Sequence, residues 1–547
     1  MISAKKFNEK LSGARRLLST KHFSEAEAVF LELLNLGQEQ ELLLRELVRL
    51  YWEWGKADQA ISSLEKLIRL APNELGFYLD LANICEQAGD LEKSAESYRQ
   101  LLQRKPDLPN TWYNLARLLK RLGRSSEALA AYQESLRYNV SRPEEVYNNI
   151  AVIFSEMRQE SKAIAALVKS IEINSAYISA RFNLGGIYEE SGDPEKALEQ
   201  YKKILSLDPD CFPALCRIAN MPRGSIDIDW LLIEIQKALE KPSVETRVRE
   251  ELLFSKGKLF DECRKFSEAF KAFRDANELG RRRFPAYSKV EHEKKIEEII
   301  NVFNRDWFSN LKGCSSLAPV FICGMYRSGS TLVEQILSGH PRVTAGGELD
   351  YFPTIGMDRL LASADTGTRD EYIQSAASGY LDYLAQRFES ASQVTDKRPD
   401  NYLNLGVIKT LFPQAKVIWT RRGLLDNCLS IYFQYLGGDM NYSVDLDFIG
   451  HYYTQQCKLM EHWCSLFPET IYPISYENLV DFPDREVRAL LEFLGLEWNS
   501  TCLDFSNRDN YVKTASIWQV RESVHKRAKS RHEHYTTFIG VLDKYKD

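Results

Sequence analysis

The stretch Gly324–Thr331, with the letters GMYRSGST, lies between a short apolar segment and a segment with helical periodicity. Its two glycines, Gly324 and Gly329, permit a tight turn between a strand and a helix. Such a turn directs successive backbone N–H groups toward one point, and the positive end of the helix dipole adds to their attraction for an anion. The pattern therefore predicts a loop that cradles a phosphate or sulfate group. The alternative is a turn that only lets the helix pack on the strand.

The loop differs from a Walker A motif, G-x-x-x-x-G-K-[ST], at the position of its lysine. Gly324 and Gly329 have the Walker spacing, but Ser330 stands where the lysine would be, and a cation appears earlier, at Arg327. A loop without that lysine lacks the usual grip on a γ-phosphate. Fixed cations and N–H groups can stabilise the charge that builds on the leaving group in a loose transition state. We therefore expect a 5′-phosphosulfate rather than a triphosphate with magnesium, and we expect no metal.

The run Tyr326–Thr331 resembles the P-R-S-G-T-T loop of the sulfotransferase superfamily, with tyrosine in place of the proline. The resemblance covers about residues 317–535 and is to the bacterial branch with tetratricopeptide repeats (TPRs) and to the tyrosylprotein sulfotransferases. It implies PAPS (3′-phosphoadenosine 5′-phosphosulfate) as co-substrate and transfer of its sulfuryl group to a hydroxyl. The loop residues that it implies as PAPS ligands are Arg327, Ser328, Gly329, Ser330 and Thr331.

Two further catalytic residues, beside Arg327, follow from the same resemblance. Glu348, 21 residues after Arg327 in the run TAGGELDYF, stands where the tyrosylprotein branch has its catalytic glutamate, and it is the expected general base. A neutral hydroxyl is a poor nucleophile, so a carboxylate within hydrogen-bond reach must accept its proton. Lys397, in VTDKRPDN, resembles the family's lysine near the sulfuryl group and the leaving oxygen. A solvated carboxylate and a surface lysine are the respective alternatives.

The 3′-phosphate of PAPS is expected at a second strand end. The run KVIWTRRGLLDNCLS supplies Arg422 and, eight residues on, Ser430, which resemble the family's arginine and serine for this phosphate. A guanidinium and a hydroxyl suit a dianionic phosphate. The sequence departs here from the family's R-D-P, because Gly423 follows Arg422. Arg421 is a competing cation, so the sequence leaves the register open.

Three further cofactor-binding residues are implied nearer the C-terminus. Tyr476, in ISYENLV, matches a tyrosine near the nucleotide, the alternative being a core aromatic at a strand end. The segment VKTASIWQVRESVHKRAKSRH resembles the family's closing loop, in which Ser516 covers the phosphate end of the adenosine. Arg531 falls where the tyrosylprotein branch has a lysine, and a solvated basic tail is its alternative. His340, in SGHP, is a rival base by resemblance to the small-molecule enzymes, but a role in capping or packing a helix end suits it better.

These residues lie where short β-prone runs alternate with helical ones. Beyond Leu317, the runs APVFICG, KVIWTR and IYPISY alternate with helical segments such as LNLGVIKTLF and VRALLEFLG. Strands separated by helices predict a parallel sheet with crossover helices. We therefore expect residues 317–547 to form a doubly wound, P-loop-like α/β domain, and the resemblance implies that it has the sulfotransferase fold.

The N-terminal part has a repeat near 34 residues. Its turn positions are spaced by 34, 34, 35 and 34 residues, and a small residue stands five positions after each. This pattern is typical of TPRs and predicts about six of them over residues 6–212, stacked into an α-helical superhelix with a concave groove. The turn positions are Gly55, Gly89, Gly123, Arg158 and Gly192, and the small residues are Ala60, Ser94, Ala128, Ala163 and Ala197.

Residues 213–310 keep the helical period but lose the regular spacing. We expect them to form a helical connector, in which residues 256–280 resemble one more degenerate TPR with Ala269 at the small-residue position. A chain of 547 residues is too long for a single ordinary core. The sequence therefore predicts three parts, 6–212, 213–310 and 317–547.

Composition narrows the class of protein. The chain is 44% hydrophobic and 27% charged with a net charge of −6, which is close to soluble averages and gives no sign of nucleic-acid binding. It lacks a signal-peptide core and an apolar run of about 18 residues, so we expect a cytoplasmic protein without a membrane partner. The ten cysteines show no CxxC pair or zinc spacing and are expected to be reduced structural thiols.

Together these features predict a PAPS-dependent sulfotransferase whose acceptor hydroxyl, tyrosine-like, lies on a protein or peptide. A TPR groove commonly holds a peptide, so it is expected to dock the acceptor; in the alternative the array only scaffolds the chain or forms a homo-oligomer. Carbohydrate and small-molecule acceptors remain open. A P-loop kinase or nucleotide hydrolase, which Ser330 disfavours, and a catalytically silent TPR adaptor are the rival functions.

Overall fold

The computed structural model describes residues 3–224, 226–309, 319–355, 360, 366–388, 393–437, 440–504, 518 and 529–546. The chain forms two compact units, residues 1–183 and 184–547.

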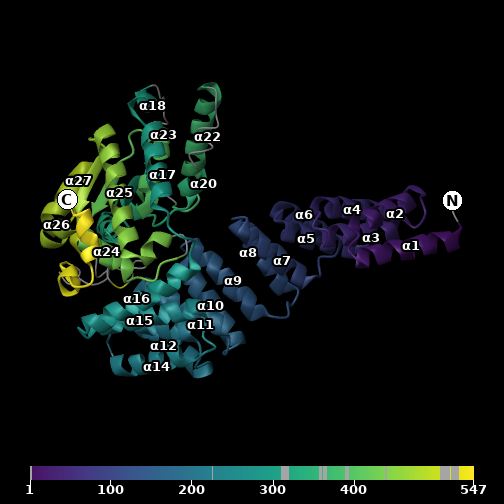
Figure 1. The fold of residues 1–547 in the computed structure, drawn as a ribbon, viewed down its shortest axis with the longest axis horizontal. Coiled ribbons are helices and arrows are strands. Elements are labelled where there is room, and N and C mark those ends of the chain that lie inside the picture. Colours follow the sequence, from purple (N-terminus) through teal and green to yellow (C-terminus); the bar gives the residue numbers. More distant parts are fainter. Residues whose placement is uncertain are drawn as a thin grey trace. The chain divides into compact units, whose positions relative to one another are not determined.

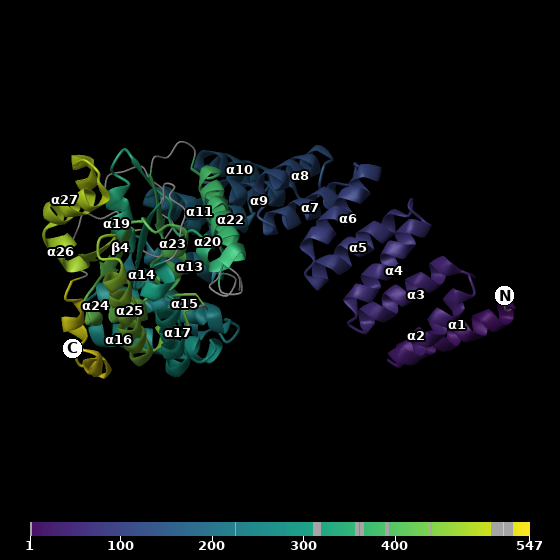
Figure 2. The ribbon, with the colours of Figure 1, turned by 90° about the horizontal axis from the view of Figure 1, so that it is seen from above.

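The first unit is built from helices that pair with their sequence neighbours and stack in succession (Figures 1 and 2). Its apolar residues, such as Leu47, Leu64 and Leu81, are buried between neighbouring helices. The bounds are α1 (Ala4–Ser19), α2 (Phe23–Asn35), α3 (Gln40–Glu53), α4 (Ala57–Leu70), α5 (Leu75–Ala88), α6 (Leu91–Arg104), α7 (Pro109–Arg121), α8 (Ser125–Arg137), α9 (Pro143–Glu156) and α10 (Glu160–Ile173). The next helix, α11 (Ile178–Ser191), contains the boundary between the two units.

The turn and packing positions of the repeat explain why these helices pair. All five turn positions have a left-handed backbone, including Arg158 with φ of 55°, which a glycine adopts without strain and which a helix commonly uses to end. The five small residues, from Ala60 to Ala197, are completely buried where two helices approach each other. The predicted tetratricopeptide superhelix is thereby confirmed as the architecture of the N-terminal part.

The first part of the second unit is also built from helices. The predicted degenerate repeat is a hairpin of α15 and α16, with Ala269 fully buried. A Cβ on Gly257 would lie 2.7 Å from the ring of Phe273, so the two helices approach too closely for any side chain there. The bounds are α12 (Pro194–Leu207), α13 (Phe212–Asn220), α14 (Ile228–Glu240), α15 (Thr246–Glu262), α16 (Phe266–Arg283), α17 (Lys289–Val302) and α18 (Arg305–Ser309).

The rest of the second unit contains a five-stranded parallel sheet in the order β2-β3-β1-β4-β5. The predicted α/β class is confirmed. The strands are β1 (Val320–Gly324), β2 (Val343–Ala345), β3 (Gln393–Lys397), β4 (Val417–Arg421) and β5 (Ile471–Ser475). The helices are α19 (Ser330–Leu337), α20 (Tyr351–Ile355), α22 (Thr366–Ala385), α23 (Leu405–Leu411), α24 (Leu424–Tyr432), α25 (Leu446–Leu466), α26 (Tyr476–Asp481) and α27 (Pro483–Leu494), with short 3₁₀ turns η1 (Pro399–Asn404), η2 (Asn441–Val444), η3 (Ser500–Leu503), η5 (Arg531–Tyr535) and η6 (Gly540–Tyr545).

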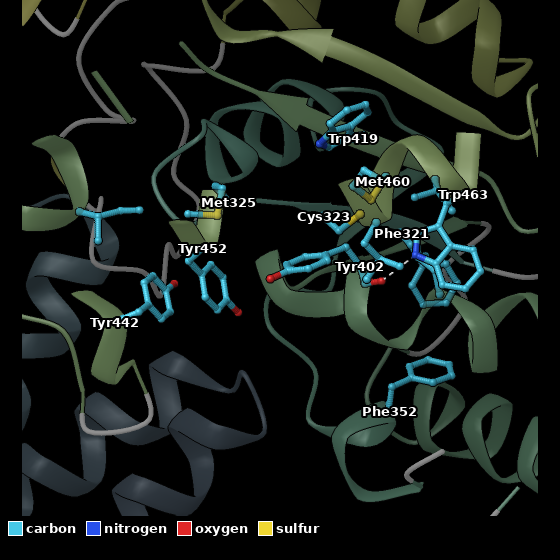
Figure 3. Packing of buried hydrophobic residues seen from close by; sticks show 14 of the residues in the cluster. Phe321, Cys323, Met325, Phe352, Tyr402, Trp419, Tyr442, Tyr452, Met460 and Trp463 are labelled. Carbon is cyan, nitrogen blue, oxygen red and sulfur yellow. Dashed lines mark hydrogen bonds between the residues drawn. The ribbon is translucent and has the colours of Figure 1, made fainter. Parts of the chain in front are cut away.

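The sheet is covered on both faces, which is why its central strands are apolar throughout. Alternate residues of β1 enter two separate cores: Phe321 packs with α22 to α25, whereas Ile322 packs with α19 and α27. In the larger core the indole of Trp463 on α25 donates a hydrogen bond to the carbonyl of Tyr402 at 3.0 Å (Figure 3). The two cores, one on each face of the sheet, hold the carboxyl ends of β1, β3 and β4 rigidly beside one another. Among the described helices, none is both long enough and apolar enough to cross a membrane.

Candidate active site

The loop between β1 and α19 is fixed by two glycines that nothing larger can replace. At Gly324, with φ of 152°, a Cβ would lie 2.4 Å from the carbonyl oxygen of Thr420 on β4. At Gly329, with φ of 101°, it would lie 2.8 Å from the ring of Tyr476. Both positions combine a left-handed backbone with close contact, which only glycine tolerates. The loop is thus held tightly between β4 and α26.

The two serines of this loop have different tasks, since Ser328 braces the loop whereas Ser330 begins α19. The Ser328 hydroxyl donates to the carbonyl of Met325 at 2.6 Å and lies 2.6 Å from the Thr420 hydroxyl oxygen, so it ties the loop to itself and to β4. Ser330 and Thr331 are the first two residues of α19, and both are buried. The N–H groups of a helix N-terminus point away from the helix, so this end of α19 presents them with the loop amides.

Arg327 and Arg422 lie together at the loop. The Nε of Arg327 donates to the Ser430 hydroxyl on α24 at 3.3 Å, and Nη1 of Arg422 donates to the backbone oxygen of Arg327 at 3.1 Å. The Arg422 guanidinium also stacks over the Tyr476 ring, 4.8 Å from its centroid. Arg421 instead is exposed and lies over Trp419. The structure therefore brings Arg422, not Arg421, to the loop, together with Ser430 and Tyr476.

This group of cations is electrostatically unfavourable by itself. Burial lowers the pKa of Arg327 to about 10, and repulsion from Arg422 and Arg531 adds to the shift. Burial likewise lowers the pKa of Arg422. An anion placed among these guanidinium groups would offset both the lost hydration and the mutual repulsion. The site is therefore suited to a ligand with more than one negative charge.

Glu348 and Lys397 form an ion pair beside the loop. Lys397 is the last residue of β3, and its Nζ lies 2.6 Å from Oε1 of Glu348, which follows β2. The lysine side chain is 1% exposed and that of the glutamate 40%, so the pair has one buried and one accessible partner. The buried ammonium fixes the orientation of a carboxylate that a ligand can still reach.

Tyr326, which stands where the P-R-S-G-T-T loop of the sulfotransferase superfamily has its proline, lies near Glu348 and Asp400. Burial raises the pKa of its hydroxyl, and the carboxylates of Asp400 and Glu348 raise it further. Asp400 is in turn paired with Arg398, whose Nε lies 2.8 Å from its Oδ1. The buried rings of Tyr442 and Tyr452 stack with their centroids 3.7 Å apart. Figure 3 shows both rings near Met325. Tyr326 and Asp400 therefore lie near the Glu348 carboxylate.

Three expected residues remain: Arg531, close enough to Arg327 to repel it, Ser516 and His340. Arg531 begins η5, its Nη2 lies 2.6 Å from Oδ2 of Asp261 on α15, and its guanidinium lies over Phe433. Ser516 lies outside the described residues. His340 is buried, with Nε2 3.1 Å from the backbone oxygen of Glu497, and its Nδ1 accepts a hydrogen bond from the backbone N–H of Arg342. It therefore packs the end of α19.

Two carboxylates that shape the site, Asp426 and Asp396, are not among the motif residues of the sequence analysis. Asp426 on α24 accepts the backbone N–H groups of Ser530 and His532 at 2.7 and 2.9 Å, which anchors the segment carrying Arg531. Asp396, next to Lys397, is completely buried and accepts hydrogen bonds from Tyr380 at 2.7 Å and Asn401 at 3.0 Å. For Asp396, the run of charged residues Asp396, Lys397 and Arg398 at a strand end was the available clue. Within the described residues, no group of three or more His, Cys, Asp or Glu side chains is placed to hold a metal ion.

Two kinds of protein-family model match the sequence of this chain. The model described as "Sulfotransferase family" matches residues 319–500, and tetratricopeptide-repeat models match residues 45–109, 109–139, 144–177 and 178–211. The first match contains β1 to β5 and thus the loop, Glu348, Lys397 and Arg422. The second set covers α3 to α12 in large part.

Curated proteins match parts of this chain. It is 30% identical over 412 residues to an uncharacterised protein of Aquifex aeolicus, covering 72% of this chain and 54% of that protein. It is 28% identical over 218 residues to protein-tyrosine sulfotransferase 1 of Danio rerio, covering 37% of this chain and 60% of that protein. The chain thus spans only part of each relative's length. A solved tetratricopeptide repeat protein from Parabacteroides merdae is 18% identical, with a TM-score of 0.33, covering 44% of this chain and 93% of that one.

The buried Asp396 gives the second unit a predictable pH dependence. Burial raises the pKa of its carboxyl to about 7. Between about pH 4 and pH 7 the folded protein then binds more protons than the unfolded chain, so this group lowers the free energy of unfolding by up to about 1.4 kcal/mol for each pH unit of increase. Asp396→Asn removes this contribution. Urea unfolding of both proteins from about pH 5 to pH 8 should show the variant gaining relative stability as pH rises, and a pH-independent difference would contradict the account.

Proposed function

We propose a reaction for this chain, which is a tetratricopeptide-repeat protein with a sulfotransferase-family domain and is related to the protein-tyrosine sulfotransferases. In this reaction it transfers a sulfuryl group from PAPS to an acceptor hydroxyl. The hydroxyl is that of a tyrosine on a protein or peptide. The observation that carries the proposal is the pairing of an accessible Glu348 with a buried Lys397, beside a loop where Arg327 and Arg422 converge.

The residues at the loop fit the charges of PAPS. The amides of Gly324–Thr331, the N-terminus of α19 and Arg327 would hold the phosphosulfate, while Arg422 and Ser430 would hold the 3′-phosphate. The lowered pKa of Arg327 supports this assignment, because a bound multiply charged anion offsets both the burial and the smaller cationic repulsion that lower it. When bound, PAPS supplies the sulfuryl group and leaves as adenosine 3′,5′-bisphosphate.

The chain's own residues have complementary tasks in this reaction. Glu348 accepts the proton of the acceptor hydroxyl as that oxygen becomes the nucleophile. Lys397, 2.6 Å away, holds the carboxylate in place and adds positive charge where negative charge develops. Arg327 lies on the other side, within the loop itself. The acceptor's proton thus moves to Oε1 or Oε2 of Glu348, and fixed cations stabilise the departing oxygen.

A tyrosine acceptor is supported by the surroundings of Glu348 and by the relatives' names. Tyr326, which is half-buried, lies near the Glu348 carboxylate and offers an aromatic ring there. A phenol ring can pack against aromatic faces with favourable offset or edge contacts. Several relatives are protein-tyrosine sulfotransferases.

The first unit offers a place for the rest of a protein acceptor. A cavity of about 380 Å³ opens among α7, α8 and α9, where the rings of Tyr113, Tyr132 and Tyr177 meet the cations Arg117 and Arg121. Both guanidinium groups share one carboxylate, Glu86, at 2.8 and 2.9 Å. The lining also carries Lys120 and the carboxylates Glu145 and Glu156, so it presents both signs of charge beside the aromatic rings. We propose that a polypeptide segment of the acceptor docks there.

The central test of the reaction is Glu348→Gln. The amide keeps the size of the side chain and can still accept a hydrogen bond from Lys397, but it cannot take a proton at neutral pH. With ³⁵S-labelled PAPS and a tyrosine-containing acidic peptide, kcat should fall by about 10²- to 10⁴-fold, while calorimetric affinity for adenosine 3′,5′-bisphosphate stays unchanged. Glu492→Gln, at an exposed position on α27, is the control. Transfer at the same rate in both variants would rule out Glu348 as the base.

The docking proposal is tested by Arg117→Ala. Loss of one charged hydrogen-bonding group should lower kcat/KM for a protein acceptor by about tenfold, whereas kcat/KM for a small phenol stays unchanged. Arg69→Ala, an exposed arginine on α4 outside the cavity, is the matched control. Equal kcat/KM values for the protein acceptor in all three proteins would show that the cavity does not bind it.

A further inference from the structure

A buried carboxylate connects the helix that follows the loop with the segment that carries Glu348. Glu334 lies on α19, one helical turn after Ser330 and Thr331, and its side chain is 3% exposed. Its Oε1 accepts the backbone N–H of Gly347 at 2.9 Å and the hydroxyl of Thr395 at 2.8 Å. Hydrogen bonds to a charged acceptor are stronger than those between neutral groups, so this oxygen holds two separate segments firmly.

The two segments are also tied to each other. The backbone N–H of Gly346 donates to the Thr395 hydroxyl at 3.2 Å, and the N–H of Lys397 donates to the carbonyl of Gly347 at 2.9 Å. A Cβ on Gly346 would lie 2.0 Å from the carbonyl oxygen of Thr395, so the segment lies directly against β3. Gly347 has a left-handed backbone, with φ of 70°.

Glu348 is the next residue, and its direction follows from this attachment. The Gly347 peptide is fixed on both sides, by Glu334 at its N–H and by Lys397 at its carbonyl. The same Lys397 then meets the Glu348 carboxylate at 2.6 Å. Without Glu334, the Gly347 N–H and the Thr395 hydroxyl would each lose an acceptor in a place that water reaches poorly.

We propose that Glu334 is a positioning residue for the reaction. It fixes Gly347 and Thr395, so that the Glu348 carboxylate points at the acceptor hydroxyl and keeps a constant position relative to the loop at the start of α19. The inference rests on the proposed function for its catalytic meaning. Because Glu334 and the first residues of α19 share one rigid helical turn, the donor-binding loop and the base move as one unit. Loss of a supporting group of this kind can misplace a reacting atom by about 1 Å and cost about 100-fold in rate.

The test compares Glu334→Ala with Glu334→Gln in the full-length protein. The glutamine oxygen can still accept both hydrogen bonds, whereas alanine accepts none. In Glu334→Ala we expect kcat about 100-fold lower, with KM for PAPS and calorimetric affinity for adenosine 3′,5′-bisphosphate unchanged, and with faster amide hydrogen exchange in the peptide that contains Gly347. Glu334→Gln should restore most of kcat and of the exchange protection. Equal losses in both variants, or unchanged exchange at Gly347 in Glu334→Ala, would overturn the proposal.

A second pair of variants covers the case in which Glu334→Ala does not fold. Thr395→Ser keeps the hydroxyl that joins Glu334 to Gly346, and Thr395→Val removes it at nearly constant volume. We expect the valine variant to lose kcat and Gly346–Gly347 exchange protection and the serine variant to keep both. If the unmodified protein transfers no label to any acceptor, the proposed function fails, while the exchange comparison still decides whether Glu334 holds this segment.

Discussion

The arrangement of the second unit depends on placing two guanidinium groups close together at the carboxyl ends of β1 and β4. Arg327 and Arg422 lose hydration and repel each other, and the pKa of Arg327 falls to about 10 as a result. Asp426 and Glu477 offset part of this cost at Arg422, and a bound anion would offset more of it. Close contacts keep the groups there: Gly324 against β4, Gly329 against Tyr476, and Ser430 accepting from Arg327. The loop is therefore preorganised for a charged ligand.

The same preorganisation extends to the acceptor side of the site. The Glu348–Lys397 pair is fixed from β3 and from the segment after β2, and Glu334 joins both to α19. Parallel strands bring these groups to one edge of the sheet, since the loops at the carboxyl ends of neighbouring strands lie side by side. Cations for an anionic donor and a carboxylate for a hydroxyl acceptor thus share one rigid framework, which is the requirement of a group-transfer reaction with fixed charges.

The features that the sequence could predict are those that depend on local geometry. Gly55, Gly89 and Gly123 marked turns that need a left-handed backbone, and the strand–loop–helix at Gly324 followed from its glycines and apolar flanks. The register between Arg421 and Arg422 was open, because only the packing of β4 decides which of two adjacent arginines turns toward the loop. The inward hydroxyl of Ser328 and the Arg531–Asp261 pair also depend on contacts between distant segments.

The repeat period continues through α12, yet Glu189 on α11 pairs with Arg217 on α13 and belongs to the second compact unit. Periodicity alone could not place that division.

The most direct test of the account is the ligand preference of the arginine site, measured by calorimetry at fixed ionic strength. Adenosine 3′,5′-bisphosphate should bind without added metal and more tightly than ATP with magnesium. Arg422→Ala should weaken bisphosphate binding by about 10- to 100-fold, as expected for a lost charged hydrogen bond, and Arg421→Ala should leave it unchanged. Tighter binding of ATP with magnesium, or equal losses at the two arginines, would contradict the assignment of this loop to a 3′-phosphorylated sulfuryl donor.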